Sequence, residues 1–409
     1  MKSLRKYPKL EITKKGSLSV QNGHPWIYED EVLTGQEGLE NGCLVDAVTE
    51  NGRYLGTGLL SLSSRIRIRI LSRNANDRFD EAFWKRRFTY AWQYRKTVMP
   101  DDLECCRVIF GEADGCPGLT VDRYADLLSV QCLSFGMEKR KDLLYPLLVD
   151  VLRSDGQEIR GIYERNDNML RRREGLEVQK GWATLPGEPL PDSAVREITE
   201  NGIRYLVDVE NGQKTGFFLD QKYNRLAVSR IAAGKRVLDC FTHTGSFALN
   251  AAAGGASHVT AVDVSEAAIS MARENAERNG LSDRVDFVTA DVFELLTALC
   301  ERGGEPYDFI ILDPPAFTKS RETAANAERG YKDINYRAMK LLPRGGYLAT
   351  ASCSHFMPAA QFERMLRAAA ADAGRSLRQI EVRQQAPDHP ILWNVPETDY
   401  LKFYLLQVV

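Results

Sequence analysis

The sequence predicts an α/β protein in which an open, mostly parallel sheet follows a small β-rich domain and a central α+β domain. Residues 237–263 give the order strand, tight turn, helix, strand and acid, which is the pattern of a parallel βαβ unit. Three later apolar runs, at 285–288, 309–312 and 347–351, predict further strands of the same sheet. In the first 75 residues, short strand candidates are instead separated by turn signals.

The length of 409 residues predicts two or three domains, and we place them at 1–75, 76–190 and 191–409. The proline-containing stretch 186–191 predicts a linker at the second boundary. With 54 basic and 56 acidic residues, the net charge is −2. A nucleic-acid site would therefore need a local basic face, because the chain as a whole is not basic.

No segment predicts a membrane span, a metal site or a disulfide framework. The start, MKSLRKYPKL, lacks the apolar core of a signal peptide, and no apolar run approaches the roughly 18 residues of a transmembrane helix. The eight cysteines include no C-x-x-C pair, which argues against a zinc ribbon. We expect a soluble, reduced, cytoplasmic protein without a metal. The oligomeric state stays open, with a homodimer as one alternative.

The first 75 residues are expected to be all-β, with strand candidates at 10–13, 17–20, 27–28, 42–48 and 54–60. The run SRIRIRIL then alternates Arg65, Arg67 and Arg69 with isoleucines. A period of two places the three guanidinium groups on one face of a strand. That face fits a solvated edge strand and a phosphate-contacting strip equally well.

Residues 80–96 predict a helix with one apolar stripe and several flanking basic residues. We expect the stripe to be core rather than a platform for base stacking; its residues are Phe83, Trp84, Phe88, Ala91 and Trp92. Strand candidates on the C-terminal side of this helix complete the predicted α+β domain.

The turn between the first two strands of the parallel sheet, Cys240–Ser246, predicts a nucleoside ligand. Gly245 lets the backbone approach a ligand at the start of a helix, and Asp263 can hold a ribose diol. The turn is not G-x-G-x-x-G, and a pyrophosphate needs such glycine-rich backbone. S-adenosylmethionine has no phosphate, so the turn favours it over NAD. An ordinary βαβ unit without a ligand remains the alternative.

Polar residues stand at the carboxyl ends of five successive strands, where ligands bind in open α/β sheets. They are Asp239, Asp263, Asp291, Asp313 and Cys353. Asp313 begins the sequence DPPAF, whose two prolines stiffen the loop and leave carbonyl groups free to accept from an amine. A flat, amine-bearing ring such as a nucleobase suits this loop, and Phe317 can stack on it.

Several of these motifs resemble known families. GHPWIYEDEV, near the start, looks like the PUA domain, an RNA-binding module with a small β-barrel, which favours RNA as the partner of the arginine strip. The strand-end acids, the Gly245 turn and DPPAF resemble the Rossmann-like class I S-adenosylmethionine-dependent methyltransferases. With FFLDQKYNR and SCSHFM, nearly the whole chain resembles the bacterial large-subunit rRNA cytosine-5 methyltransferases of the RlmI type.

This resemblance implies ribosomal RNA as the partner and assigns a chemistry to Cys353. A thiolate that adds at C6 of cytosine makes C5 able to attack a sulfonium methyl, and Asp313 would contact the base at N3 or its amino group. A buried structural cysteine is the alternative. DPPAF has no second cysteine, so the base that removes the C5 proton stays unassigned.

The resemblance also implies the remaining site residues. Asp263 would hold the ribose, Asp291 the adenine amine, and Asp239 with Gly245 the methionine end. Further cofactor contacts would come from Phe241, Thr244, Val264, Asp313, Gln221 and Arg225. The RNA contacts would be Arg65, Arg67, Arg69, Pro314, Pro315 and Phe317.

Two other functions remain open from the sequence. One is a methyltransferase with the same cofactor that acts on guanine N7 or adenine N6, where DPP-type loops also occur. The other is a non-catalytic RNA-binding protein.

Overall fold

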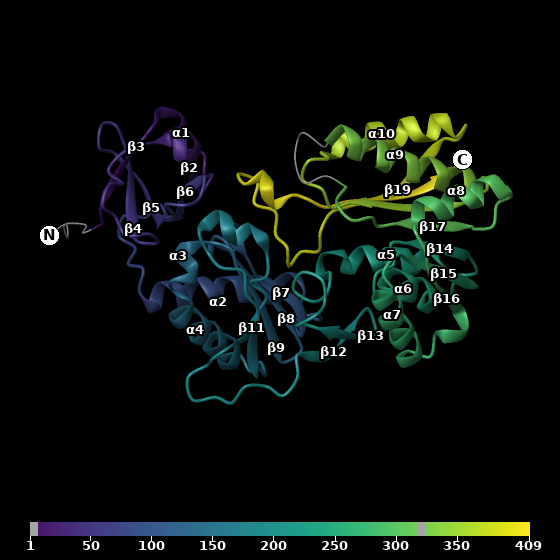
Figure 1. The fold of residues 1–409 in the computed structure, drawn as a ribbon, viewed down its shortest axis with the longest axis horizontal. Helices are drawn as coiled ribbons and strands as arrows, with labels where there is room; N and C mark the ends of the chain where they lie inside the picture. The colour runs from purple at the N-terminus through teal and green to yellow at the C-terminus, as the bar shows by residue number, and fades with distance from the viewer. Residues whose placement is uncertain (1–6, 318–323) are drawn as a thin grey trace. The chain divides into compact units, whose positions relative to one another are not determined.

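The computed structural model describes residues 7–317 and 324–409 (Figure 1). The chain divides into two compact units. The N-terminal unit holds the residues up to Ile198 together with Val207–Leu219 and Pro387–Thr398. The C-terminal unit holds Thr199–Leu206, Asp220–Ala386 and Asp399–Val409. In the described ranges, every helix is too short or too polar to span a membrane.

The first sheet of the N-terminal unit has six strands in the order β2-β6-β5-β4-β1-β3. All neighbouring pairs are antiparallel except β1 with β4. The expected strand at 17–20 is wrong, because these residues lie in helix α1 (Lys14–Gln21), where the Thr13 side chain accepts from the Gly16 amide and so caps the start. The strands are β1 Lys9–Ile12, β2 Trp26–Tyr28, β3 Val32–Thr34, β4 Leu44–Thr49, β5 Tyr54–Leu60 and β6 Ile66–Ser72.

A second sheet in this unit has five strands in the order β11-β10-β9-β8-β7. Helix α2 (Glu81–Val98) packs against β7 and against α4 (Lys141–Ser154). The five stripe residues of α2 are at most 3% exposed, which confirms that the stripe is core. The other elements are β7 Cys105–Phe110, η2 Gly111–Asp114, β8 Leu119–Tyr124, β9 Leu127–Cys132, α3 Phe135–Glu138, β10 Gly161–Glu164, η3 Met169–Glu174 and β11 Gly181–Ala183.

A two-stranded hairpin, β12 (Val195–Glu200) with β13 (Ile203–Asp208), joins the two units along the chain. Its turn residues Asn201 and Gly202 have φ values of +53° and +77°. Asparagine and glycine tolerate this left-handed region better than other residues, which is why this pair marks a hairpin.

The C-terminal unit is built on a seven-stranded sheet in the order β16-β15-β14-β17-β18-β20-β19. The first five strands are parallel, and β20 and β19 are antiparallel to their neighbours. The chain order reverses between β14 and β17, so this is the topological switch point where α/β sheets bind ligands. The strands are β14 Arg236–Cys240, β15 His258–Asp263, β16 Val285–Thr289, β17 Phe309–Leu312, β18 Tyr347–Ser352, β19 Leu377–Arg383 and β20 Lys402–Val408.

Helices flank this sheet between the strands, as the sequence predicts for a Rossmann-like unit (Figure 1). The β17 strand is fully buried, as a central parallel strand should be. The helices are α5 Lys222–Ile231, α6 Ser246–Ala253, α7 Glu266–Arg278, α8 Val292–Arg302, α9 Ala324–Leu341 and α10 Ala359–Asp372.

Candidate active site

The loop from β14 to α6 has an unusual backbone at the switch point. Phe241, His243 and Gly245 have φ values of +64°, +51° and +84°. Only glycine adopts this region without steric cost, so Phe241 and His243 each carry a strain of roughly 1–3 kcal/mol. At Gly245 a Cβ atom would lie 3.0 Å from the Cβ of Ala272. Glycine is therefore required at 245 both by conformation and by space.

Asp239 lies fully buried beside this loop, at the end of β14. Its Oδ2 accepts from the Thr242 hydroxyl at 2.5 Å, whereas its Oδ1 has no hydrogen-bond partner among the described residues. Burial raises the pKa of Asp239 to about 7, and the neighbouring acids Asp313 and Asp263 act in the same direction. A buried carboxylate oxygen without a donor fits a cationic ligand group, such as the ammonium of a methionine moiety.

Thr244, in the same loop, also has a buried hydroxyl without a hydrogen-bond partner in the described chain. It lies one residue before the glycine that opens α6. Together, Asp239 and Thr244 provide two buried polar atoms without a hydrogen-bond partner in residues 7–317 and 324–409. These are the atoms that a bound ligand would be expected to contact.

Asp263 ends β15 and is held by two backbone amides. Its Oδ2 accepts from the amide of His243, and its Oδ1 accepts from the amide of Ser265, both at 2.9 Å. Each carboxylate oxygen can accept more than one hydrogen bond, so both stay able to accept from a ribose hydroxyl. Val264, the next residue, is 71% exposed and offers an apolar surface beside the acid.

Asp291 follows β16 and has a structural role of its own. It is the exposed N-cap of α8, and its Oδ1 accepts from the amides of Phe293 and Glu294 at 2.8 and 3.1 Å. Helix capping therefore accounts for an acid at this position without a ligand.

Asp313, directly after β17, is joined to Gln221 of the FFLDQKYNR segment. The Gln221 Nε2 donates to Asp313 Oδ1 at 2.8 Å, and the Gln221 Oε1 accepts from Asn224 at 2.6 Å. Gln221 is only 4% exposed, so its side chain is fixed. Two motifs that lie 92 residues apart in the sequence thus meet at one carboxylate.

Arg225, one turn further along α5, has a different partner. Its Nε and Nη2 donate to the two carboxylate oxygens of Glu200 at 2.6 and 2.8 Å, and both side chains are buried. Glu200 was not among the predicted site residues, because a single glutamate in a hairpin strand carries no distinctive pattern. The pair ties the hairpin to α5 within the C-terminal unit.

The loop after Asp313 combines a buried Pro314 with an exposed Pro315. Phe317 is half-buried in an aromatic cluster, with its ring centroid 4.6 Å from that of Tyr331 and 5.7 Å from that of Phe293. The ring thus packs against protein side chains on part of its surface.

Cys353 follows β18, the strand next to β17, and is half-buried. Lys402, which was not among the predicted site residues, lies on β20 opposite Ser352. Its Nζ donates to the carbonyl oxygens of Ser354 and Tyr400 at 2.6 and 2.8 Å. Burial lowers the pKa of Lys402 to about 8, while the charge of Cys353 acts in the opposite direction. The only signal in the sequence was a lone charge in the apolar run of β20.

Comparison with known proteins identifies the family. Residues 168–405 match the model of S-adenosylmethionine-dependent methyltransferases, and residues 10–73 match that of PUA-like domains. Ribosomal RNA large subunit methyltransferase I of Klebsiella pneumoniae (strain 342) is 40% identical, over 98% of this chain and 99% of its own. The protein of the same name from Escherichia coli O139:H28 is 39% identical over the same shares. The chain belongs to the ribosomal RNA large subunit methyltransferase I family. Its cofactor is S-adenosylmethionine.

Two solved structures of other proteins have the same fold as this ribosomal RNA large subunit methyltransferase I family member. A structure from Streptococcus mutans, described as a SAM-dependent methyltransferase, has a TM-score of 0.80 with 22% identity. A methyltransferase crystallised in complex with SAH has a TM-score of 0.81 with 23% identity. Both alignments cover 98% of this chain and 100% of the other. At this identity the likeness concerns the fold alone.

The arginine strip of this family member differs from the expectation. β6 lies between β2 and β5, so it is not an edge strand. Arg65 is exposed, but Arg67 and Arg69 are 5% and 7% exposed, so the expectation of three guanidinium groups on an accessible face is wrong for these two. Arg67 pairs with Glu29, and Arg69 pairs with Glu174 through hydrogen bonds of 2.7 and 3.2 Å. Arg67 is thus compensated by an exposed carboxylate and Arg69 by a buried one, and of the three arginines only Arg65 keeps the predicted exposure.

Proposed function

We propose that this chain methylates C5 of a cytosine in large-subunit ribosomal RNA, through a covalent bond between Cys353 and C6 of the base. The observation that carries the proposal is the position of Cys353. It follows β18, the neighbour of β17, at the carboxyl edge of the sheet. Asp313 follows β17 at the same edge, and the Asp239 Oδ1, which has no hydrogen-bond partner among the described residues, lies there as well. The names of the relatives at about 40% identity support ribosomal RNA as the substrate.

The cofactor would lie along the carboxyl ends of β14, β15 and β16. Asp239 and Thr244 would receive the methionine end, beside Phe241 and the close backbone at Gly245. Asp263 would accept from the ribose hydroxyls, and Val264 and Asp291 would contact the adenine. When bound there, S-adenosylmethionine supplies an electrophilic sulfonium methyl group.

The protein groups would then act on the cytosine. The Cys353 thiolate adds to C6, which places electron density on C5 so that C5 can take the sulfonium methyl group. After the transfer a base accepts the C5 proton, the C5–C6 double bond re-forms, and the bond between the Cys353 sulfur and C6 breaks. Asp313, oriented by Gln221, holds the base at N3 or its amino group. Pro314 and Pro315 keep the loop rigid, and Phe317 borders the base.

Complementation of a strain that lacks the protein tests this proposal. Ribosomal RNA from the deletion strain should lose one 5-methylcytosine by mass spectrometry, and the wild-type gene should restore it. Cys353→Ala should not restore it, although the variant still binds S-adenosylmethionine. Cys300→Ala is a matched control, because Cys300 is also half-buried but lies on α8 and should restore the base fully.

Other outcomes separate the alternatives. Methylation by Cys353→Ala would contradict the covalent route and favour attack through a ring or exocyclic nitrogen, as in guanine N7 or adenine N6 transfer. If wild-type protein bound RNA without methylating it, the chain would act as a binding protein only.

A further inference from the structure

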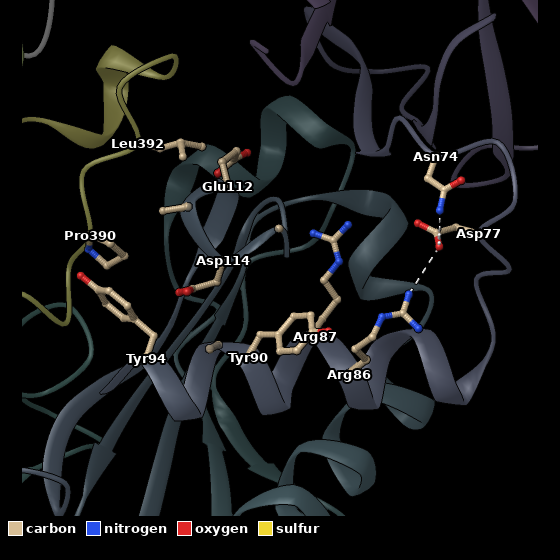
Figure 2. Close-up of a pocket in the computed structure, with 13 residues that line it drawn as sticks. Asn74, Asp77, Arg86, Arg87, Tyr90, Tyr94, Glu112, Asp114, Pro390 and Leu392 are labelled. Atoms are coloured by element: carbon tan, nitrogen blue, oxygen red, sulfur yellow. Dashed lines mark hydrogen bonds and ion pairs between the residues drawn. The ribbon is translucent and has the colours of Figure 1, made fainter. Parts of the chain in front are cut away.

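The N-terminal unit contains a pocket of about 680 Å³ that the proposed reaction does not use (Figure 2). Helix α2 forms one wall, Glu112 and Asp114 of η2 lie across from it, and Pro390 and Leu392 lie at one end. Gly115 also lines the pocket. Its volume is within the range of sites that hold a small ligand.

Two tyrosines of α2 line this pocket, next to Ala91 of the buried stripe. Tyr90 is 65% exposed and Tyr94 is 37% exposed, and they lie one helical turn apart. Neighbouring large aromatic side chains that stay in water are typical of binding surfaces rather than of a folded core. Flat rings of this kind stack on nucleobases of any sequence.

Arg87 is a fixed cation in the same pocket (Figure 2). Its Nη2 donates to the carbonyl oxygen of Leu71, and its guanidinium lies 4.8 Å from the ring centroid of Phe83. It makes no ion pair with a carboxylate in the described part of the chain. At Gly115, which has a φ of +66°, a Cβ atom would lie 1.7 Å from the Arg87 Nη1. Glycine at 115 therefore makes room for the arginine.

The acidic residues of the pocket are already engaged. Asp114 accepts from Arg95 through two hydrogen bonds of 2.6 and 2.8 Å, and Asp77 lies 3.5 Å from Arg86. Glu112 accepts from the indole N–H of Trp26 at 2.9 Å, which leaves a carboxylate able to accept from a further amine. The pocket thus offers a cation for a phosphate, two rings for a base and an acceptor for an amino group.

We propose that this pocket binds one unpaired nucleotide of the RNA substrate, with its phosphate on Arg87 and its base against Tyr90 and Tyr94. The nucleotide must be unpaired, because a base within a duplex is stacked on its neighbours and cannot lie against a side chain. The identification of the ligand as RNA rests on the proposed function. The pocket itself lies entirely in the N-terminal unit, whereas Cys353 belongs to the C-terminal unit.

Fluorescence anisotropy of the full-length protein, without cofactor, tests the proposal. The probes are a labelled single-stranded RNA oligonucleotide and the same strand annealed to its complement. The double variant Tyr90→Ala with Tyr94→Ala should weaken single-strand binding about tenfold, and the matched phenylalanine variants, which keep the rings, should bind within about twofold of wild type. Arg87→Gln should reduce the slope of log affinity against log salt by about one.

Lys85→Gln is the control for charge, because Lys85 lies on α2 outside the pocket and pairs with Asp150. Undetectable wild-type binding to the single strand, unchanged binding by the alanine variants, or an equal loss in Lys85→Gln would overturn the proposal. An equal loss for duplex and single strand would also overturn it. The binding assay contains no cofactor, so it does not depend on methylation. If the wild-type protein did not methylate RNA but still bound single-stranded RNA through the pocket, the proposed reaction would be contradicted and the pocket proposal would stand.

Discussion

The Lys402 ammonium donates a 2.6 Å hydrogen bond to the carbonyl oxygen of Ser354, the residue directly after Cys353. The lysine is 7% exposed, and it lies on a strand that pairs with β18. A cation held at this place favours the thiolate over the thiol, as cations do beside reactive cysteines. We therefore expect Lys402 to act as a positioning residue for the proposed nucleophile.

Lys402→Met should slow methyl transfer most strongly at low pH. Because burial lowers the Lys402 pKa to about 8, the wild-type lysine is charged below that pH and loses its charge above it. We expect a rate about tenfold below wild type near pH 7 at saturating RNA, with the difference narrowing above pH 8. Rates measured across this range check the prediction. If the ratio of the Lys402→Met rate to the wild-type rate did not change with pH, the lysine would act only through packing.

Asp239→Asn should weaken cofactor binding and stabilise the protein without its cofactor. A carboxylate whose folded pKa is about 7, against 3.8 in a model peptide, binds more protons when folded, so stability falls as pH rises from about 4 to 7 and stays lower above. Asparagine removes this penalty, which is at most about 4 kcal/mol. Thermal unfolding at pH 8 and calorimetry with S-adenosylmethionine check both effects. If the Asp239→Asn variant bound S-adenosylmethionine with wild-type affinity, Asp239 would not contact the cofactor.

Arg225→Met should destabilise the fold without a specific loss of cofactor affinity. The substitution leaves Glu200 buried without its partner, and breaking a buried pair in this way costs about 3–5 kcal/mol. Replacing Glu200 by Leu in the same chain should recover much of the loss, because no buried charge remains. Urea unfolding measures the stability. If the folded variant bound S-adenosylmethionine much more weakly, the result would support the cofactor role that the resemblance implies for Arg225.

Arg65 and Arg69 should respond differently to the loss of their charge. Arg65→Gln should lower the salt slope of RNA binding by about one and leave stability unchanged, because this side chain is exposed. Arg69→Gln should destabilise the protein, because Glu174 remains buried. Denaturant unfolding and binding at several salt concentrations separate the two. If Arg65→Gln left the slope of log RNA affinity against log salt concentration unchanged, Arg65 would be a solvent-exposed residue without a role in RNA binding.

Much of the C-terminal unit could be predicted, because its signals are local. Apolar runs that end in an acid mark parallel strands, and DPPAF follows the central one. The missed features depend on distant partners. Arg69 is 105 residues from Glu174, so its alternation with isoleucine looked like an exposed face. Lys402 and Glu200 are single charges whose importance comes from burial. The helix at 14–21 was not predicted, because the short apolar run at 17–20 suggested a strand. The Thr13 side chain caps and stabilises the helix instead.

The left-handed backbone at Phe241 and His243 has a consequence for laboratory evolution. A screen for heat resistance alone should enrich glycine at His243, since glycine removes the steric cost there, but not at Phe241, whose ring packs against the core of the C-terminal unit. The same substitution by glycine would let the loop between β14 and α6 adopt more conformations in the absence of cofactor. Ordering the loop would then cost more entropy, and the affinity for S-adenosylmethionine would fall. Selection for thermal stability should therefore favour glycine at position 243, whereas selection for methyltransferase activity should retain histidine there.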